Sequence, residues 1–444
     1  MIEIEQLNNP VIITSAFFVI LLLALWLPVI STRYLLTAVF AYLVSHTIAY
    51  SLLRYFPDYQ LLLTRVMQSV VFILMWCFFV KIATVMKSVT INFQLLKVIF
   101  ILNLMVALGI LIGILNDHPV KWVFSDGVRY IQIIAGYSFA VLFFSAASFQ
   151  KVMLVVMLIS LVPALVNIAI GVQYITFGEI RFAAGDISGV IFIPWILGQL
   201  IALPKATNKC YFVLLAIFAT SLLVTMTRTY WLAVIIAILP LAGVSLLIKK
   251  QLKLLAYLLI ALLAVYVLDL FTKGQFFDSM VIRLQDVFED LSWKFRLEES
   301  INLIQSWIDS PTLGKGLGAT FPVGKLFAEM HGLDPNLQLR YPHFGFLEIL
   351  LYFGMVGLAI YAWIVLRTVF MCVKIASRNT DENERALALG LLGIVIAISI
   401  VSPFAIGLGL FTGFIYGAAQ KLYFDYKRKK LLVKLKTSRH DNAS

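Results

Sequence analysis

The sequence predicts an all-α membrane protein, a polytopic bundle of about 12–14 transmembrane helices with one large extracytoplasmic helical loop. Two observations predict this class. The first is composition: 61% of the 444 residues are hydrophobic and the mean hydropathy is +0.96, whereas a soluble domain is usually about 45–50% apolar. The second is pattern: the apolar residues gather in runs of about 20, the length that crosses a bilayer as a helix.

The apolar runs divide the chain into candidate spans and connections. Thirteen runs have the composition of a spanning helix: 11–30, 34–53, 66–86, 96–114, 128–147, 152–174, 189–203, 211–226, 230–248, 254–271, 344–366, 386–402 and 404–424. The least certain are 189–203, which is short and contains Pro194, and the last two, which only Pro403 separates. We therefore expect transmembrane helices over 1–271, a large loop over 272–342, further transmembrane helices over 343–424 and a basic cytoplasmic tail over 425–444.

Lysine and arginine residues indicate which helix ends face the cytoplasm. They concentrate in alternate connections, at Arg33, Lys81 and Lys87, Lys151, Lys205 and Lys209, Lys249 to Lys253, Arg367 to Arg385, and in the tail. Short cytoplasmic loops are enriched in these residues, so we place this set in the cytoplasm and the 272–342 loop outside. Much of the net charge of +12 lies in 421–436, after an apolar helix. That position favours contact with anionic lipid over a nucleic-acid partner.

The large loop contains a predicted amphipathic helix over 293–308. Its apolar residues recur at steps of three and four: Trp293, Leu297, Ile301, Ile304 and Ile308. Such a stripe predicts a helix that lies on the membrane or caps the bundle. Ser310-Pro311 ends it, and Gly314, Gly316 and Gly318 follow in a compact turn. The turn is open to two interpretations, a helix-ending loop or a loop that binds a substrate phosphate.

His343 is the first candidate catalytic residue. It follows Pro342 at the outer start of an apolar run, and an imidazole can accept a proton at neutral pH, as a general base must. The alternative is an interfacial histidine that reaches water without a chemical role. Four neighbouring residues are possible supporting groups: His331, Arg340, Tyr341 and Glu348. The last of these would orient a partner or pair with an arginine.

Three arginines on outer segments, Arg181, Arg228 and Arg296, are candidate anion ligands. Arginine outside the membrane runs against the usual charge bias, and a guanidinium binds phosphate oxygens with two parallel hydrogen bonds. The alternative is a set of salt bridges to nearby carboxylates.

Other polar residues are weaker candidates. Asp117-His118 and the pair of Asp126 and Arg129 fall in a predicted outer loop, where capping or gating is expected rather than catalysis. The sequence contains no HExxH, CxxC, clustered-aspartate or P-loop motif. We therefore expect no metal site, no cofactor and no use of a nucleotide.

The order of these motifs resembles the O-antigen ligase and Wzy-type polysaccharide polymerase superfamily of integral membrane, GT-C-like glycosyltransferases. The resemblance covers roughly 170–360. Its pieces are Arg181-Phe-Ala-Ala-Gly185, Thr227-Arg228-Thr229, Arg296 with Trp307 and Pro311-Thr-Leu-Gly314-Lys-Gly316-Leu-Gly318, and Pro342-His343-Phe-Gly-Phe-Leu-Glu348 leading into Tyr352-Phe-Gly354-Met-Val-Gly357. Each piece is short, so the resemblance rests on the order of the pieces around one outer loop.

The resemblance implies a metal-independent transferase that takes a glycan from an undecaprenyl-pyrophosphate-linked donor. It implies Arg181, Arg228 and Arg296 as pyrophosphate ligands and His343 as the base that activates the acceptor hydroxyl. It also implies a multi-pass protein of the bacterial inner membrane with its active site facing the periplasm, in lipopolysaccharide or exopolysaccharide biosynthesis. A chain-length regulator would be a possible protein partner.

The resemblance leaves the acceptor open. Ligases of the superfamily often carry paired histidines or His-Asn before this helix, whereas here Phe344-Gly345 follows one histidine. That departure favours a polymerase, which extends a lipid-linked repeat unit, over a ligase, which transfers the glycan to lipid A-core. A transporter or flippase is less favoured, because it would call for ionisable residues at mid-helix depth and repeated halves.

Overall fold

The computed structural model of the chain describes residues 93–176, 188–203, 208–225, 227–248, 272–278, 291–332, 337–342, 344–379, 381–401 and 408–441, with isolated positions between 255 and 281 and at 334. These residues form helices almost throughout. The helices are α4 (Phe93–Leu115), α5 (Val120–Phe143), α6 (Ala146–Ile159), α7 (Leu161–Thr176), α8 (Ser188–Ala202), α9 (Asn208–Val224), α10 (Arg228–Leu247), α13 (Leu291–Ile308), α14 (Lys325–His331), α15 (Gly345–Arg378), α16 (Glu382–Val401) and α17 (Leu408–Asp441). The predicted all-α class is confirmed.

Five segments of the described part are long and apolar enough to cross a membrane: Leu96–Leu115, Phe149–Val172, Arg228–Leu247, Gly345–Arg378 and Glu382–Val401. The protein is therefore a multi-pass membrane protein. The predicted spans over 96–114, 230–248, 344–366 and 386–402 correspond to α4, α10, α15 and α16. The predicted spans over 11–30, 34–53 and 66–86, and most of 254–271, lie outside the described residues.

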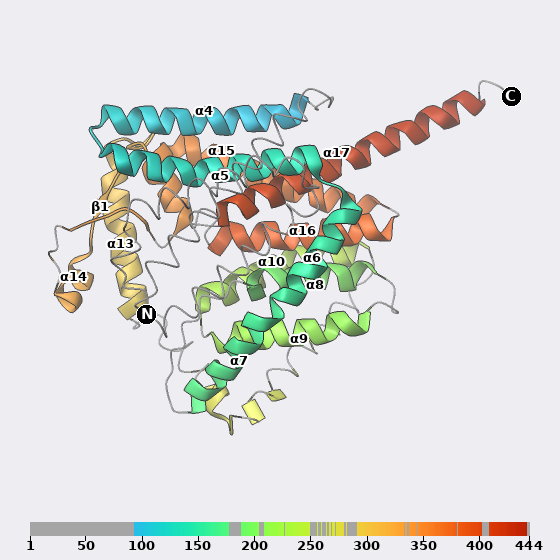
Figure 1. Cartoon of the computed structure of the whole chain (residues 1–444), viewed down its shortest axis with the longest axis horizontal. Helices are drawn as coiled ribbons and strands as arrows, with labels where there is room; N and C mark the ends of the chain where they lie inside the picture. The colour runs from blue at the N-terminus through green and yellow to red at the C-terminus, as the bar shows by residue number, and fades with distance from the viewer. Residues whose placement is uncertain are drawn as a thin grey trace, which may run out of the picture.

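One predicted boundary is wrong, and the predicted tail has a secondary structure that the sequence analysis did not assign. Helix α5 begins at Val120 rather than at 128, so Asp126 and Arg129 lie inside a helix and not in an outer loop. Their charges are tolerated there because each is buried against an opposite charge. Helix α17 continues to Asp441, so most of the predicted tail is helical and projects from the bundle (Figure 1). Lysine, leucine and arginine are good helix formers, and no glycine or proline follows Gly417.

Helices α5 and α17 lie against each other with their backbones close together. Gly409, Gly413 and Gly417 form a stripe at every fourth position of α17. A Cβ on Gly413 or Gly417 would collide with a carbonyl of α5, and a Cβ on Gly136 of α5 would collide with the backbone of α17. Small residues at helix interfaces permit such approach in membranes, where van der Waals packing and not water exclusion drives association.

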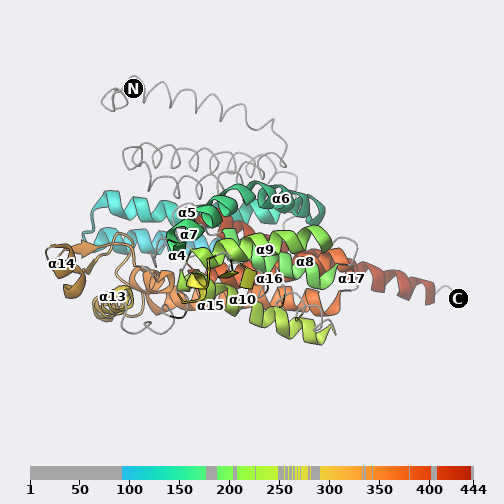
Figure 2. The same ribbon diagram turned by 90° about the horizontal axis from the view of Figure 1, so that it is seen from below.

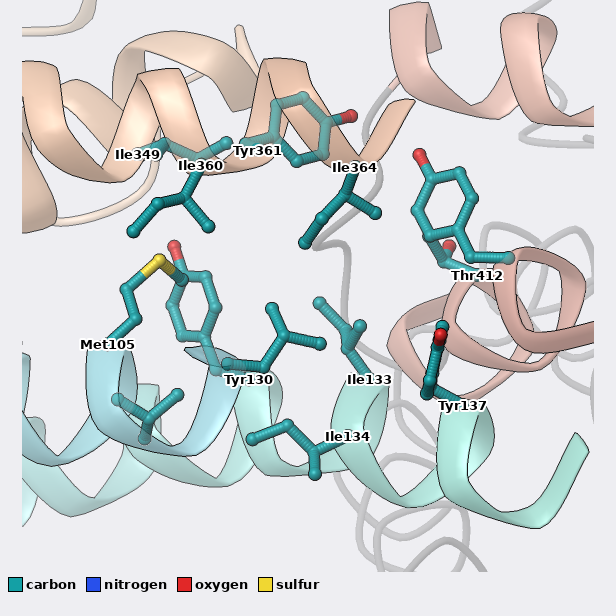
Figure 3. A pocket seen from close by; sticks show the side chains of 13 residues that line it. Met105, Tyr130, Ile133, Ile134, Tyr137, Ile349, Ile360, Tyr361, Ile364 and Thr412 are labelled. Atoms are coloured by element: carbon teal, nitrogen blue, oxygen red, sulfur yellow. The ribbon is translucent and has the colours of Figure 1, made fainter. Parts of the chain in front are cut away.

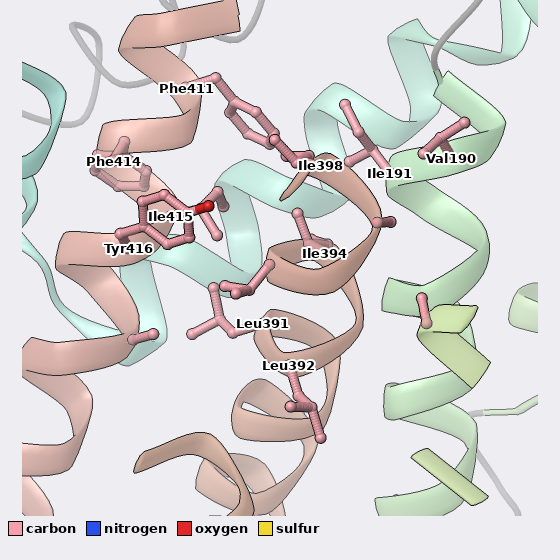
Figure 4. Close-up of a cluster of buried hydrophobic side chains, with 14 of the residues drawn as sticks. Val190, Ile191, Leu391, Leu392, Ile394, Ile398, Phe411, Phe414, Ile415 and Tyr416 are labelled. Atoms are coloured by element: carbon pink, nitrogen blue, oxygen red, sulfur yellow. The ribbon is translucent and has the colours of Figure 1, made fainter. Parts of the chain in front are cut away.

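The core beside this interface joins α8, α16 and α17. Figure 4 shows Leu391, Ile394 and Ile398 of α16 between the aromatic side chains of α17 and the aliphatic side chains of α8. Phe411 and Phe414 of α17 are buried in the same cluster. The helices that carry the candidate site are thus held by an extensive apolar core.

The connections gather at two opposite ends of the bundle (Figure 1). One end carries α13, α14 and the turn between α4 and α5. The other carries the turn between α15 and α16, where Lys429 of α17 pairs with Glu384. The basic segment before α16 and the basic part of α17 therefore lie at the same end, as the charge pattern predicts. We refer to the end with α13 as the outer end.

Candidate functional site

Helix α13 crosses the outer end of the bundle at a steep angle to the spanning helices, upright in Figure 1 and seen end-on in Figure 2. It confirms the predicted amphipathic helix. The five apolar residues of the predicted stripe are between 36% and 59% exposed, whereas Leu303 and Glu299 of another face are buried. Within the described part of the chain, the stripe is therefore not the face through which α13 packs on the bundle.

One of the three candidate arginines, Arg296 of α13, contacts the residue that follows a second one, Arg228, at the start of α10. Arg228 is the first residue of α10, and Thr227 before it has extended backbone angles. Arg296 of α13 donates a hydrogen bond from Nη1 to Oγ1 of Thr229, at 3.2 Å. The Thr227-Arg228-Thr229 motif and Arg296, 67 residues apart, thus form one site. A helix N-terminus also carries partial positive charge and suits an anion.

The glycine turn is wedged into a break in α15. Gly314, Gly316 and Gly318 have φ values of +73°, +83° and +82°, which L side chains rarely adopt. Gly354 interrupts α15 with a φ of +62°. The break leaves helix carbonyls and amides without their usual partners, and the turn supplies replacements.

Four backbone hydrogen bonds join the turn to the broken helix. The N–H groups of Lys315 and Gly316 donate to the carbonyls of Leu351 and Tyr352, at 2.8 and 3.1 Å. In return, the N–H groups of Met355 and Val356 donate to the carbonyls of Pro311 and Thr312, at 2.9 and 3.1 Å.

The remaining amides of the turn are also used within the protein. Gly314 donates to the Ser310 carbonyl, Leu317 to that of Gly109, and Gly318 to the Asp126 carboxylate. The turn therefore has no amide left to bind a phosphate, and of the two interpretations the structure supports the structural one.

The predicted outer loop before α5 also holds this turn. Asn116 Nδ2 donates to the carbonyl of Lys315 at 3.0 Å, and His118 Nε2 lies 2.9 Å from the same oxygen. The expected capping role of the Asp117-His118 loop fits this arrangement.

Asp126 is the centre of a first buried ion pair. Its side chain is fully buried, and Oδ1 lies 2.7 Å from Nη2 of Arg340. Its Oδ2 accepts the Gly318 N–H at 3.0 Å. Arg340 also donates to the carbonyl of Trp122 and lies over that ring, 5.1 Å from its centre. One carboxylate thus connects α5, the glycine turn and the segment before α15.

Arg129 and Glu348 form a second buried ion pair. Nη1 of Arg129 lies 2.7 Å from Oε1 of Glu348, and Nη2 lies 3.3 Å from Oε2. This two-point contact confirms that Glu348 pairs with an arginine. The ring of Tyr341 lies near both guanidiniums, 4.6 Å from Cζ of Arg129 and 4.9 Å from Cζ of Arg340. Partial burial, followed by the charge of Asp126, raises the pKa of Tyr341, so this phenol is protonated at neutral pH.

The remaining predicted site residues are less fully placed. His343 and Arg181 lie outside the described residues, although Pro342 and Phe344 on either side of His343 are described. His331 is the last residue of α14. The structure adds Asp126 and Arg129 to the site, which sequence reasoning had assigned to capping or gating. The sequence did contain one indication of this role: Asp126 and Arg129 carry opposite charges, are three residues apart and lie among apolar residues.

A small apolar cavity lies between α4, α5, α15 and α17 (Figure 3). Its volume is about 30 Å³. Tyr130 and Ile349, the neighbours of Arg129 and Glu348, line one part, and Tyr137 and Thr412 line another. The lining is almost wholly apolar. Ligand pockets are usually about 300–1,000 Å³, so this space is a packing gap between the helices.

The fold and the site define a multi-pass membrane protein with buried charges and an arginine pair at one end. Residues 212–362, roughly a third of the chain, match the model of the family Wzy_C, described as O-Antigen ligase. The predicted resemblance to the O-antigen ligase and Wzy superfamily is thereby confirmed. The family comprises membrane glycosyltransferase-like enzymes, ligases or polymerases. No curated protein matches the chain.

The matched stretch includes α10, α13, the glycine turn, His343 and the first part of α15. It begins after Arg181, so that residue receives no support from the match.

Proposed function

We propose that the protein is a membrane glycosyltransferase that moves a glycan from a polyprenyl-pyrophosphate-linked donor to an acceptor hydroxyl without a metal ion. One observation carries the proposal: within the matched stretch, Arg296 of the outer helix contacts the Thr227-Arg228-Thr229 motif at the start of α10. A guanidinium at the N-terminus of a helix whose own first residue is an arginine suits a pyrophosphate.

In this reaction the acceptor oxygen attacks the anomeric carbon of the donor sugar while the bond from that carbon to the pyrophosphate oxygen breaks. His343 takes the proton of the acceptor hydroxyl. The lipid pyrophosphate leaves with the electron pair of the broken bond, and Arg228, Arg296 and Arg181 balance its charge. Stabilising such charge contributes roughly 3–4 kcal/mol per donor in characterised enzymes. The activated donor supplies the free energy, so no nucleotide is needed.

The preferred reaction is polymerisation, in which the acceptor is another lipid-linked repeat unit. The single histidine followed by Phe344-Gly345 favours it. The second candidate is ligation to lipid A-core, which the description of the matched family favours. The less favoured transporter assignment gains little from the structure, since Arg340 precedes α15 and Glu348 lies in its first turn.

We place the outer end on the periplasmic face of a bacterial inner membrane, because the basic connections lie at the opposite end. A cysteine introduced at residue 330 should react with an impermeant thiol reagent in intact spheroplasts, and one introduced at 380 should react only after lysis. The reverse labelling would refute this orientation and the reaction assigned to the outer face.

The decisive experiment gives the purified protein a lipid-linked repeat unit alone. Polymerase activity would produce a ladder of longer glycans. A parallel reaction with lipid A-core added would instead produce one glycan joined to the core if the protein is a ligase. Both reactions should proceed in EDTA. Absence of product in both, from protein that is folded and binds the donor, would refute the transferase assignment.

A further inference from the structure

Two buried ion pairs join α5 to the chain on both sides of His343. Arg340 lies three residues before this histidine and pairs with Asp126, and Glu348 lies five residues after it and pairs with Arg129. Asp126 and Arg129 are three residues apart in α5, so they project from the same face of that helix. One helix face therefore holds both flanks of the candidate base.

The charges allow one alignment of the segment on α5. Along α5, Asp126 precedes Arg129. Along the 340–348 segment the order of charge is reversed, because Arg340 precedes Glu348. A shift by one helical turn would bring Arg129 to Arg340, or Asp126 to Glu348. Like charges in a site this buried repel strongly, because little water screens them. The crossed pattern thus specifies register, a role for which buried polar pairs are well suited.

Further contacts fix the two flanks. The hydroxyl of Tyr352, one turn after Glu348, donates to the carbonyl of Arg340 at 2.9 Å. Asp126 receives the amide of Gly318, so the glycine turn holds the same carboxylate that holds Arg340. The segment is bound to the bundle by side chains on each side of His343.

We propose that the pairs Asp126–Arg340 and Arg129–Glu348 are positioning pairs, which set the register of the 340–348 segment on α5 and so place His343 for proton transfer. This inference rests on the proposed function, since it takes His343 as the base. The four charged side chains act through His343 and contact no reacting atom. Their pairing, rather than the charge of any one of them, is what transfer requires.

The test compares single and double neutralisation of one pair in the full-length protein, reconstituted in lipid nanodiscs. Arg129→Gln and Glu348→Gln each leave one buried charge without its partner, whereas the double variant removes both charges and retains groups that can hydrogen-bond. Removing one partner of a buried pair is far more disruptive than replacing both. Each single variant should lower kcat by about 100-fold, the size expected when reacting groups are displaced by about 1 Å. The double variant should recover most of that loss.

Two measurements separate positioning from a general structural role. The KM for the donor should stay close to the wild-type value, because the arginine pair of α10 and α13 is untouched. Hydrogen exchange in peptides covering 340–348 should accelerate in both single variants and return toward the wild-type rate in the double variant. Glu384→Gln is the matched control: it breaks the ion pair with Lys429 at the opposite end and should change neither kcat nor exchange in 340–348.

The outcomes are distinct. A double variant as inactive as the singles would overturn the inference and make Glu348 or Arg129 a direct participant. Unchanged exchange and unchanged kcat in folded single variants would overturn it as well. If the wild-type protein transfers no glycan, the proposed function fails, yet the exchange experiment still decides whether the pairs fix the segment. Should the single variants fail to insert, Arg129→Lys keeps the charge and should show the same loss in milder form.

Discussion

Replacing Gly316 by alanine would test whether the glycine turn is a structural wedge between α4 and the broken helix α15. Gly316 has a φ of +83°, and its N–H donates to the carbonyl of Tyr352. An added Cβ would collide with the backbone of Ile112 and Gly113 in α4. Backbone cannot move aside as a flexible side chain does, so the turn would have to withdraw from α4.

A second glycine separates the cost of the collision from the cost of the backbone conformation. Gly274 has nearly the same φ, +85°, and a Cβ added there would meet no heavy atom of the described residues within 4 Å. Alanine at either position has to adopt the left-handed conformation, at about 1–2 kcal/mol. At Gly316, withdrawal also breaks the bond from the Leu317 N–H to the Gly109 carbonyl of α4, and each of these two groups, left unsatisfied, costs about 1–3 kcal/mol. Gly316→Ala should therefore cost about 2–6 kcal/mol more than Gly274→Ala.

The assay is unfolding of the full-length protein in mixed micelles with increasing SDS, followed by loss of helical circular dichroism and by protease sensitivity. Gly274→Ala should shift the midpoint slightly, and Gly316→Ala should shift it far more or prevent accumulation of folded protein. Equal shifts for the two variants would refute the wedge, because the shared strain would then account for the whole effect.

Three further predictions concern the reaction and the membrane. Arg228→Lys and Arg296→Lys keep a positive charge but lose the planar fork, so transfer of the glycan should be nearly as slow as in the alanine variants; near-normal transfer would mean that these arginines only support the fold. His343→Ala should slow transfer by about 10²–10⁴-fold in protein that still binds donor, and EDTA should have no effect on the wild type; retention of more than about a tenth of the activity would assign the base elsewhere. A fluorophore on Ile301→Cys, in the exposed apolar stripe of α13, should be quenched by brominated lipid, whereas one on Ser306→Cys, on the opposite face of the helix, should not. Quenching at 301 no stronger than at 306 would refute contact of the stripe with the bilayer.

Hydropathy and local periodicity predicted most of the described helices, because both depend on neighbouring residues. The steps of three and four from Trp293 to Ile308 predicted α13 to within two residues of its observed start. Connections rich in lysine and arginine alternate along the chain with connections that are not, and this alternation predicted which turns lie at the same end of the bundle. The boundary of α5 was wrong because the charged residues Asp126 and Arg129 were assigned to a loop, although a helix accommodates charges that are paired.

The long-range contacts of the site could not be predicted from the sequence. Asp126 and Arg340 are 214 residues apart, and Arg129 and Glu348 are 219 apart. Gly354 resembles an ordinary glycine in an apolar run, and its φ of +62° becomes visible only with the turn that pairs with the broken backbone. Likewise the glycines of that turn predicted a tight bend, but not that its amides would donate to α15 and to Asp126.

The break in α15 and the charges of α5 solve a single physical problem. In the proposed function, the segment with the base His343 lies at the membrane surface, where neither water nor lipid surrounds it completely. Contacts within the protein must therefore fix its position. Helix–helix packing alone fixes such a segment weakly, since lipid competes for apolar contacts. Hydrogen bonds and ion pairs in a buried site cannot be exchanged for water, so leaving them unmade is costly. The outer part of α15 uses both: backbone hydrogen bonds join it to the glycine turn on both sides of Gly354, and an ion pair from Glu348 joins it to α5 nearer its start. The proposed chemistry therefore depends on residues that contact no substrate.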